Sequence, residues 1–158
     1  MHTVLSILSV AAGASQLVVS TDKGPVRGVE FNGAIVHRGI PYAEPPTGEN
    51  RWRATVPKAP WTDVLDASEF GPGCPQGFRP VVSGQSEDCL TVNVFAPPGA
   101  DNLPVMFYIH GGAFWSGSSS EWFYDGSMLA RDYGVVVVTI NYRVGALGFM
   151  TIPEDLES

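Results

Sequence analysis

The chain has 158 residues, of which 44% are hydrophobic and 16% charged, and its formal net charge at pH 7 is −7. This composition is typical of a folded domain with a hydrophobic core and excludes a chain that is disordered throughout. The 9 Lys and Arg residues are scattered along the sequence, so they form no concentrated basic segment. Because phosphate binding needs such a basic face, we expect no nucleic-acid partner.

The N-terminal residues combine a short apolar run with small residues. The run covers residues 4–12, and Ala12-Gly13-Ala14 has the small-x-small pattern of a signal peptidase site. The run is too short to span a bilayer, and no other segment is long and apolar enough for a membrane span. The start offers only His2 where Lys or Arg is usual. We expect residues 1–14 to be a signal peptide and the protein to be secreted; a buried N-terminal strand or helix is the alternative.

The next part of the sequence reads as short strands. Asn32-Gly33 between "VEF" and "AIV" is the residue pair that type I′ hairpin turns favour. The following stretch, "PYAEPPTGENRWRATVPKAPW", contains five prolines and no sustained period. It predicts a long surface connection, held in place by Trp52 and Trp61, rather than a helix or a central strand.

Cysteine usage agrees with export. The chain has two cysteines, Cys74 and Cys89, which enclose the Gly-, Pro- and Ser-containing segment "PQGFRPVVSGQSED". A disulfide that closes a loop of this size stabilises a protein by about 3 kcal/mol. Two unpaired buried thiols are the alternative. His2, His37 and His110 show no ligand spacing with the cysteines, so we expect neither a metal nor another cofactor.

The later part of the sequence predicts an α/β sheet. "CLTVNVFAP" alternates apolar and polar residues like a half-buried strand, whereas "PVMFYIH" and "GVVVVTINY" are typical of strands covered on both faces. Between these two runs, Asp125 can cap the start of a short helix and Gly134 can end it. The helix would then connect two parallel strands, and antiparallel N-terminal strands would lead into a parallel sheet.

The candidate functional site is the glycine-rich segment after "PVMFYI". Functional crevices of open α/β sheets lie outside the carboxyl ends of the parallel strands, where this pattern places Gly111, Gly112 and Ala113. Small side chains leave the backbone N–H groups open to a ligand, and such groups stabilise a developing oxyanion. The alternative is a turn that serves chain geometry alone.

Several blocks of sequence resemble the type B carboxylesterase and cholinesterase family of α/β hydrolases, over about Val18 to Phe149. In the family's order they are "VRGVEFNG", "GIPYAEPPTGENRW", "PWTDVLDASEFGPGCPQ", "SEDCLTVNVFAP", "IHGGAFWSGSSS" and "NYRVGALGF". The resemblance implies an α/β-hydrolase fold, with residues 15–158 as the N-terminal part of a carboxylesterase type B domain that stops before the nucleophile elbow.

The resemblance also assigns roles to residues of the glycine-rich segment. Gly112 and Ala113 would be the backbone donors of the oxyanion hole, with His110 and Gly111 as supporting residues that shape the loop, and a third amide would follow the nucleophile. His110 is not expected to transfer protons. Phe114 and Trp115 would line the acyl or alcohol pocket, or alternatively serve only in packing.

The resemblance pairs Cys74 with Cys89 as the family's first disulfide and Arg51 with Glu87 as an ion pair. Two solvated charges are the alternative for the latter. The segment between the cysteines has neither a helical apolar period nor a Trp. It therefore predicts an ordinary esterase rather than a lid-gated lipase or a cholinesterase.

The triad expected of such an esterase is not complete in this sequence. Ester hydrolysis of this type needs a Ser in G-x-S-x-G, then Asp or Glu, then His, and the segments around Ser86 and Ser118 lack the final Gly. The resemblance thus implies a carboxylic ester hydrolase with an acyl-enzyme intermediate and a small-molecule ester substrate, while we expect this chain alone to be inactive. A non-catalytic adhesion or binding member of the same fold, and a fragment without function, are the alternatives. The sequence makes no prediction of oligomeric state.

Overall fold

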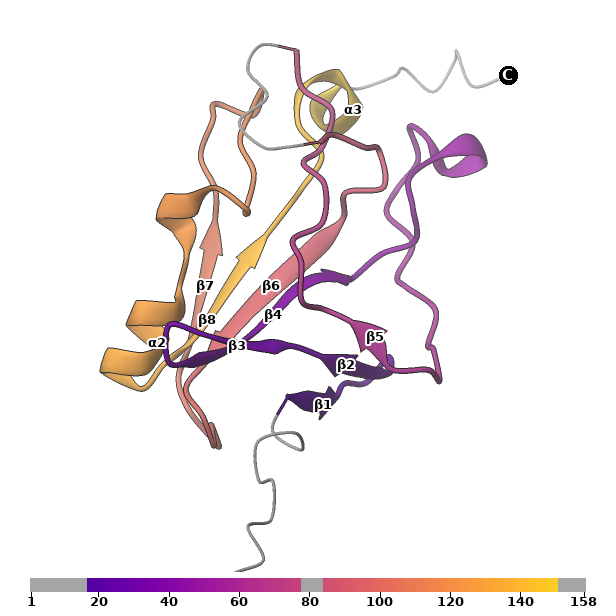
Figure 1. The fold of residues 1–158 in the computed structure, drawn as a ribbon. Coiled ribbons are helices and arrows are strands. Elements are labelled where there is room, and N and C mark those ends of the chain that lie inside the picture. The colour runs from indigo at the N-terminus through magenta and orange to yellow at the C-terminus, as the bar shows by residue number, and fades with distance from the viewer. Residues whose placement is uncertain (1–16, 78–83, 151–158) are drawn as a thin grey trace, which may run out of the picture.

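The computed structural model describes residues 17–77 and 84–150, so the predicted signal peptide lies outside the described residues. A five-stranded sheet has the order β3-β4-β6-β8-β7, and a three-stranded sheet has the order β1-β2-β5 (Figure 1). The elements are β1 (Val18–Ser20), β2 (Pro25–Arg27), β3 (Val29–Phe31), β4 (Ala34–Pro41), η1 (Gly48–Asn50), β5 (Leu65–Asp66), β6 (Thr91–Ala96), β7 (Val105–Ile109), η2 (Trp122–Tyr124), α2 (Ser127–Tyr133), β8 (Val136–Ile140) and α3 (Gly145–Phe149).

The hairpin predicted at Asn32-Gly33 joins β3 to β4. Phe31 pairs with Ala34, and the two residues between them have φ angles of 51° and 78°. Positive φ at both central residues is the requirement of a type I′ turn. The prediction is therefore confirmed.

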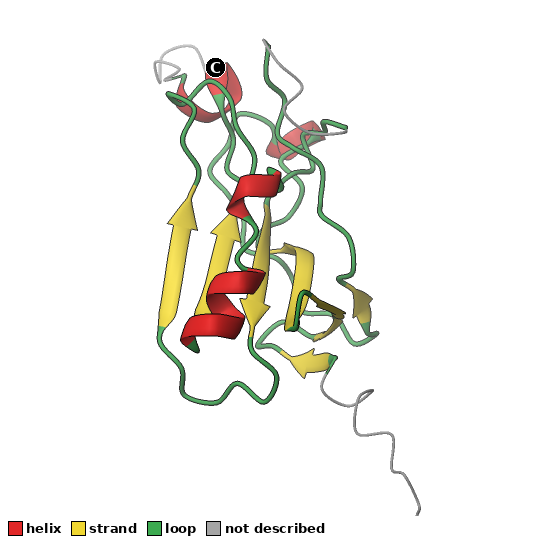
Figure 2. Ribbon diagram, turned by 60° about the vertical axis from the view of Figure 1, so that its left-hand side comes forward, coloured by secondary structure: helices red, strands yellow, loops and turns green. Residues whose placement is uncertain are grey.

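The core lies where β4, β6 and β8 meet α2. Along β6, residues alternate between buried and partly buried, as the sequence pattern predicts. Phe95 of β6 is fully buried in one cluster with Val36 and Val137 of the neighbouring strands and Ala130 of α2. Figure 2 shows α2 lying in front of the strands. One side of the sheet is thus closed over Phe95.

The predicted crossover connects β7 through α2 to β8. The two strands pair in parallel from Val105 and Val136 onward, while β8 pairs antiparallel with β6. Gly134 ends α2 in the left-handed conformation at φ 63°, as predicted. The residue at the N-cap is Gly126 rather than Asp125, but the Asp125 carboxylate still accepts a hydrogen bond from the Ser127 N–H at 2.8 Å. Antiparallel strands thus lead into a parallel pair.

The prediction that β7 is covered on both faces is wrong for the described residues. All five residues of β7 are exposed, with Val105 at 63% and Ile109 at 61%. The physical reason is position, because β7 is the edge strand and α2 packs against β4, β6 and β8 instead. β8 has neighbours on both sides, and its residues alternate between buried and partly buried.

The long connection after β4 is anchored by one of its two tryptophans. The Trp61 indole N–H donates to the Pro25 carbonyl at 3.0 Å, and its ring packs against the cluster around Val26 and Ile40. Trp52 is 42% exposed and lines a small hollow with Pro75 and Arg143, so the prediction that it also holds this connection stays a prediction. The connection carries only the short η1 turn, in agreement with its proline content.

Candidate active site

The loop that follows β7 has an unusual backbone at the carboxyl end of the parallel strands. Gly112, Ala113 and Phe114 have φ angles of 127°, 54° and 65°, in the region that L-residues rarely adopt. A Cβ atom at Gly112 would lie 1.9 Å from the Ser116 carbonyl oxygen. Glycine is therefore required at position 112 both for its φ angle and for its closeness to the next turn.

The N–H groups of Gly112 and Ala113 are open on this loop. Both residues are exposed, and neither N–H donates a hydrogen bond to any group within residues 17–77 and 84–150. The carbonyl in the same peptide group as the Ala113 N–H is engaged, since this Gly112 carbonyl accepts from the Trp115 and Ser116 N–H groups at 3.0 and 3.1 Å. Two unpaired donors on a fixed backbone are the arrangement that an oxyanion hole needs.

His110 is buried beneath this loop. Only 3% of its surface is exposed, its Nδ1 lies 2.8 Å from the Gly111 carbonyl oxygen, and its ring stacks on Tyr142 at 4.3 Å. Desolvation by burial lowers the pKa of His110, and the nearby Gly111 carbonyl and Glu121 oppose this only in part. The imidazole is accordingly neutral at pH 7 and faces the protein's own backbone.

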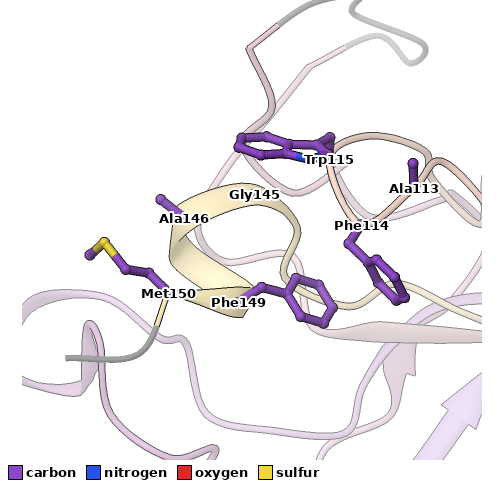
Figure 3. A pocket seen from close by; sticks show the side chains of 7 residues that line it. All are labelled: Ala113, Phe114, Trp115, Gly145, Ala146, Phe149 and Met150. Carbon is purple, nitrogen blue, oxygen red and sulfur yellow. The ribbon is translucent and has the colours of Figure 1, made fainter. Parts of the chain in front are cut away.

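An apolar cavity of about 410 Å³ adjoins the open amides (Figure 3). The centroids of the Phe114 and Phe149 rings are 4.8 Å apart with their planes tilted by 58°, and Trp115 lies over Gly145. The Gly145 N–H donates to the Phe114 carbonyl at 2.6 Å, which joins the loop after β7 to the start of α3. The full lining is Ala113, Phe114, Trp115, Gly145, Ala146, Phe149 and Met150.

A second hollow of about 330 Å³ lies on the His110 side of the loop. Gly112 and Ala113 line it together with Ile109, and Ala113 belongs to both hollows. Among the described residues that line the two hollows, none is an Asp, Glu, Lys or Arg. A ligand at the amides therefore meets uncharged side chains on both sides.

The Cys74–Cys89 disulfide lies close in sequence to a residue that binds this loop. Cys74 and Cys89 are bonded, as predicted, and both are buried. Next to Cys74, the Gln76 amide binds the backbone of Gly117 twice, accepting from its N–H at 2.9 Å and donating to its carbonyl at 3.0 Å. Sequence reasoning did not single out Gln76, because its only signal is its place beside a cysteine.

Other predicted residues lie around this site. Arg51 and Glu87 form the predicted ion pair, with side chains 50% and 23% exposed, so its contribution to stability is about 0–1 kcal/mol. Phe114 and Trp115 line the cavity, and their assignment to an acyl or alcohol pocket stays a prediction. Residues 78–83 of the segment between the cysteines lie outside the described residues, so the prediction that it forms no lid stays a prediction.

The described serines do not form a nucleophile elbow. Ser118 is fully buried, and its hydroxyl bonds to Ser120 at 2.8 Å and to the Asn141 side chain at 3.2 Å. Within residues 17–77 and 84–150, no three His, Cys, Asp or Glu residues are grouped as metal ligands would be. Over the same ranges, no helix has the length and apolar character needed to cross a membrane.

Comparisons with known sequences agree on one family. The model of the carboxylesterase family matches residues 15–157. Para-nitrobenzyl esterase of Bacillus subtilis (strain 168) is 50% identical over 140 residues, which are 84% of this chain and 29% of that protein. Acetylcholinesterase of Danio rerio is 44% identical over 161 residues, covering 90% of this chain and 25% of that protein.

Solved structures show the same relationship. A thermophilic PNB esterase is 50% identical and superposes with a TM-score of 0.82 over 87% of this chain and 30% of its own. A carboxylesterase of Geobacillus stearothermophilus is 45% identical, with a TM-score of 0.77 over 85% of this chain and 28% of its own. The chain spans about three tenths of the length of these relatives, and its mixed sheet is part of an α/β-hydrolase fold. The chain belongs to the carboxylesterase family.

Proposed function

We propose that these residues form the oxyanion-binding part of the active site of a serine-type carboxylic ester hydrolase. The observation that carries the proposal is the pair of open N–H groups at Gly112 and Ala113, exposed beside an apolar cavity at the carboxyl end of β7. The positions of Gly112 and Ala113 in the glycine-rich segment that resembles the family's oxyanion loop support the same role. The 158 residues contain no G-x-S-x-G for the nucleophile, and in this family's chain order the acid and then the base follow the nucleophile, so we expect none of the three among these residues.

The chemistry at the two amides is stabilisation of charge. When a serine oxygen attacks the ester carbonyl carbon, a C–O bond forms and the carbonyl π electrons move onto the carbonyl oxygen. The Gly112 and Ala113 N–H groups donate to that oxyanion, and the amide after the nucleophile supplies a third donor. The general base takes the serine proton during the attack and gives it to the alcohol oxygen as the intermediate collapses. The bond between the carbonyl carbon and that oxygen breaks, the alcohol leaves, and an acyl-enzyme remains for water to hydrolyse. Removing one donor of this kind raises the barrier by about 2.7–4 kcal/mol.

The lining of the cavity favours neutral, apolar esters. Phe114, Trp115 and Phe149 offer aromatic surface, and no charged side chain among the described residues reaches the hollow. A cationic choline group would have no carboxylate there, although aromatic faces attract cations in general. We infer that the substrates are short-chain esters of uncharged alcohols, taken up without a lid.

The proposal is tested in a chimera in which this chain replaces the matching N-terminal 29% of the Bacillus subtilis para-nitrobenzyl esterase. We expect turnover of p-nitrophenyl butyrate, labelling by a fluorophosphonate, a smooth rate curve on tributyrin across its solubility limit, and no preference for butyrylcholine over butyl butyrate. A folded chimera that neither turns over esters nor takes the label contradicts an enzymatic role and favours the non-catalytic binding member. The chain expressed alone serves as the inactive control.

Export is the second part of the proposal. The Cys74–Cys89 bond supports it, because disulfides persist in oxidising compartments. Residues 1–14 would be removed, so N-terminal sequencing of exported protein should begin at Ser15. Detection of an uncleaved N-terminus in exported material contradicts the signal-peptide assignment.

A further inference from the structure

The peptide group between Gly111 and Gly112 is held by the side chain that precedes it. The Gly111 carbonyl lies 2.8 Å from Nδ1 of His110. Because a carbonyl oxygen only accepts, Nδ1 must carry the proton. In a planar trans peptide the C=O and N–H bonds point in opposite directions, so holding the Gly111 carbonyl also fixes the direction of the Gly112 N–H.

We infer that His110 is a positioning residue that aims the Gly112 N–H at the oxyanion. This inference rests on the proposed function of that N–H. A hydrogen bond to the carbonyl also polarises the peptide group, which makes its N–H a stronger donor. His110 then acts through the peptide group and touches neither the substrate nor the nucleophile.

The two proposed oxyanion donors depend on different supports. The Ala113 N–H belongs to the peptide of the Gly112 carbonyl, which accepts from the Trp115 and Ser116 backbone N–H groups. That peptide is held by the turn itself and needs no side chain. Only the Gly112 N–H depends on a side chain, so substitution of His110 should weaken one donor and leave the other.

Tyr142 holds His110 in turn. Its hydroxyl donates to the His110 carbonyl at 2.7 Å, and its ring stacks on the imidazole at an interplanar angle of 14°. A Cβ atom at Gly117 would lie 2.4 Å from Nδ1, so the Gly117 backbone also packs closely against the ring. The Nε2 atom is buried and bonds to no group in the described part of the chain. The bond to Gly111, the stack and the Gly117 backbone therefore set the orientation of the ring.

The test compares His110→Leu with His110→Asn in the chimera described above. The Asn side-chain N–H can take the place of Nδ1–H, whereas Leu is of similar size without a donor. We expect His110→Leu to lower kcat on p-nitrophenyl butyrate about 10- to 100-fold with little change in KM, since losing a whole donor lowers kcat about 10²- to 10³-fold. His110→Asn should recover most of that loss. Tyr142→Phe should lower kcat by a smaller factor.

Matched controls separate positioning from stability. His37 is also buried, and its Nε2 bonds to the Leu17 carbonyl at 3.1 Å, away from the loop. The Tyr42 hydroxyl donates to the Asn141 carbonyl at 3.0 Å, which matches the bond that Tyr142→Phe removes. His37→Leu and Tyr42→Phe should lower the melting temperature and leave kcat unchanged. An equal loss of kcat in control and test variants contradicts the inference.

A spectroscopic measurement needs no activity. The ¹⁵N shifts of His110, recorded on the chimera, should show the Nδ1-protonated tautomer; the Nε2-protonated form contradicts the inference. The two proposals also fail in different ways. An inactive, unlabelled chimera counts against the proposed function, whereas an active chimera with His110→Leu equal to the unsubstituted protein counts against the role of His110 alone.

Discussion

Two adjacent glycines show how differently the same residue type is used in this loop. At Gly112 the φ angle is 127° and a Cβ would collide with the Ser116 carbonyl, whereas a Cβ at Gly111 would meet nothing within 4 Å. The motif "HGG" cannot distinguish the two positions. The constraint at Gly112 comes from the turn that brings Ser116 back against it.

We predict that Gly112→Ala is far more harmful than Gly111→Ala. The added methyl at position 112 must displace the Ser116 backbone, which turns the Gly112 and Ala113 N–H groups away from the oxyanion. In the chimera, kcat should fall about 10²- to 10³-fold, as for loss of one oxyanion donor. Gly111→Ala should lose much less. Equal kcat values for the two variants, measured on p-nitrophenyl butyrate, would contradict this account of the loop.

At the scale of elements, the active-site loop is held by segments that are distant in sequence. Cys89 lies just before β6, and its bond to Cys74 fixes the segment in which Gln76 binds Gly117. Gly117 in turn closes against His110. The loop after β7 is thus held by hydrogen bonds with Gln76, which lies at the start of the segment that the disulfide closes.

We predict that removing the disulfide lowers stability by about 3 kcal/mol, the loop-closure value for a separation of 15 residues. In the chimera, the double variant Cys74→Ser/Cys89→Ser should unfold at a lower urea concentration than the unsubstituted chimera. Its turnover should also fall, because the Gln76–Gly117 contact loosens. Reductant provides the control, because it should shift the unmodified protein to the midpoint of the variant and leave the variant unmoved. A reductant effect on the variant, or none on the parent, would contradict the prediction.

At the scale of the whole molecule, β7 is the open edge of the described fold. All five of its residues are exposed, and so are Trp122 at 85% and Tyr133 at 74% on the elements beside it. Apolar surface of this extent on an edge strand invites association. The relatives are about three times as long, so those proteins have further chain available to cover the corresponding surface.

We predict that the 158-residue chain on its own binds the dye ANS and self-associates. In the chimera, β7 should be covered, and both effects should disappear. The variant Val105→Lys/Ile109→Lys places charges on the open edge and should keep the chain monomeric in sedimentation experiments. If the unsubstituted 158-residue chain is monomeric and does not bind ANS, the prediction that β7 is an open edge in solution is wrong.

The sequence by itself determined the features that depend on neighbouring residues. Asn32-Gly33 predicted the hairpin, the alternation in β6 predicted its buried face, and Gly134 predicted the end of α2, because turn and helix-end geometry are set over a few residues. The position of the glycine-rich loop followed from the rule that functional crevices of α/β sheets lie outside the carboxyl ends of the parallel strands.

Only the tertiary structure decided the features that depend on distant segments. Gln76 meets Gly117 across 41 residues of sequence, and Tyr142 meets His110 across 32. The exposure of β7 has the same origin, since its apolar sequence indicates a strand whose faces can be covered but not whether any element lies there. Contacts at such separations are fixed by how strands and loops pack in space, and local residue patterns carry no signal for them.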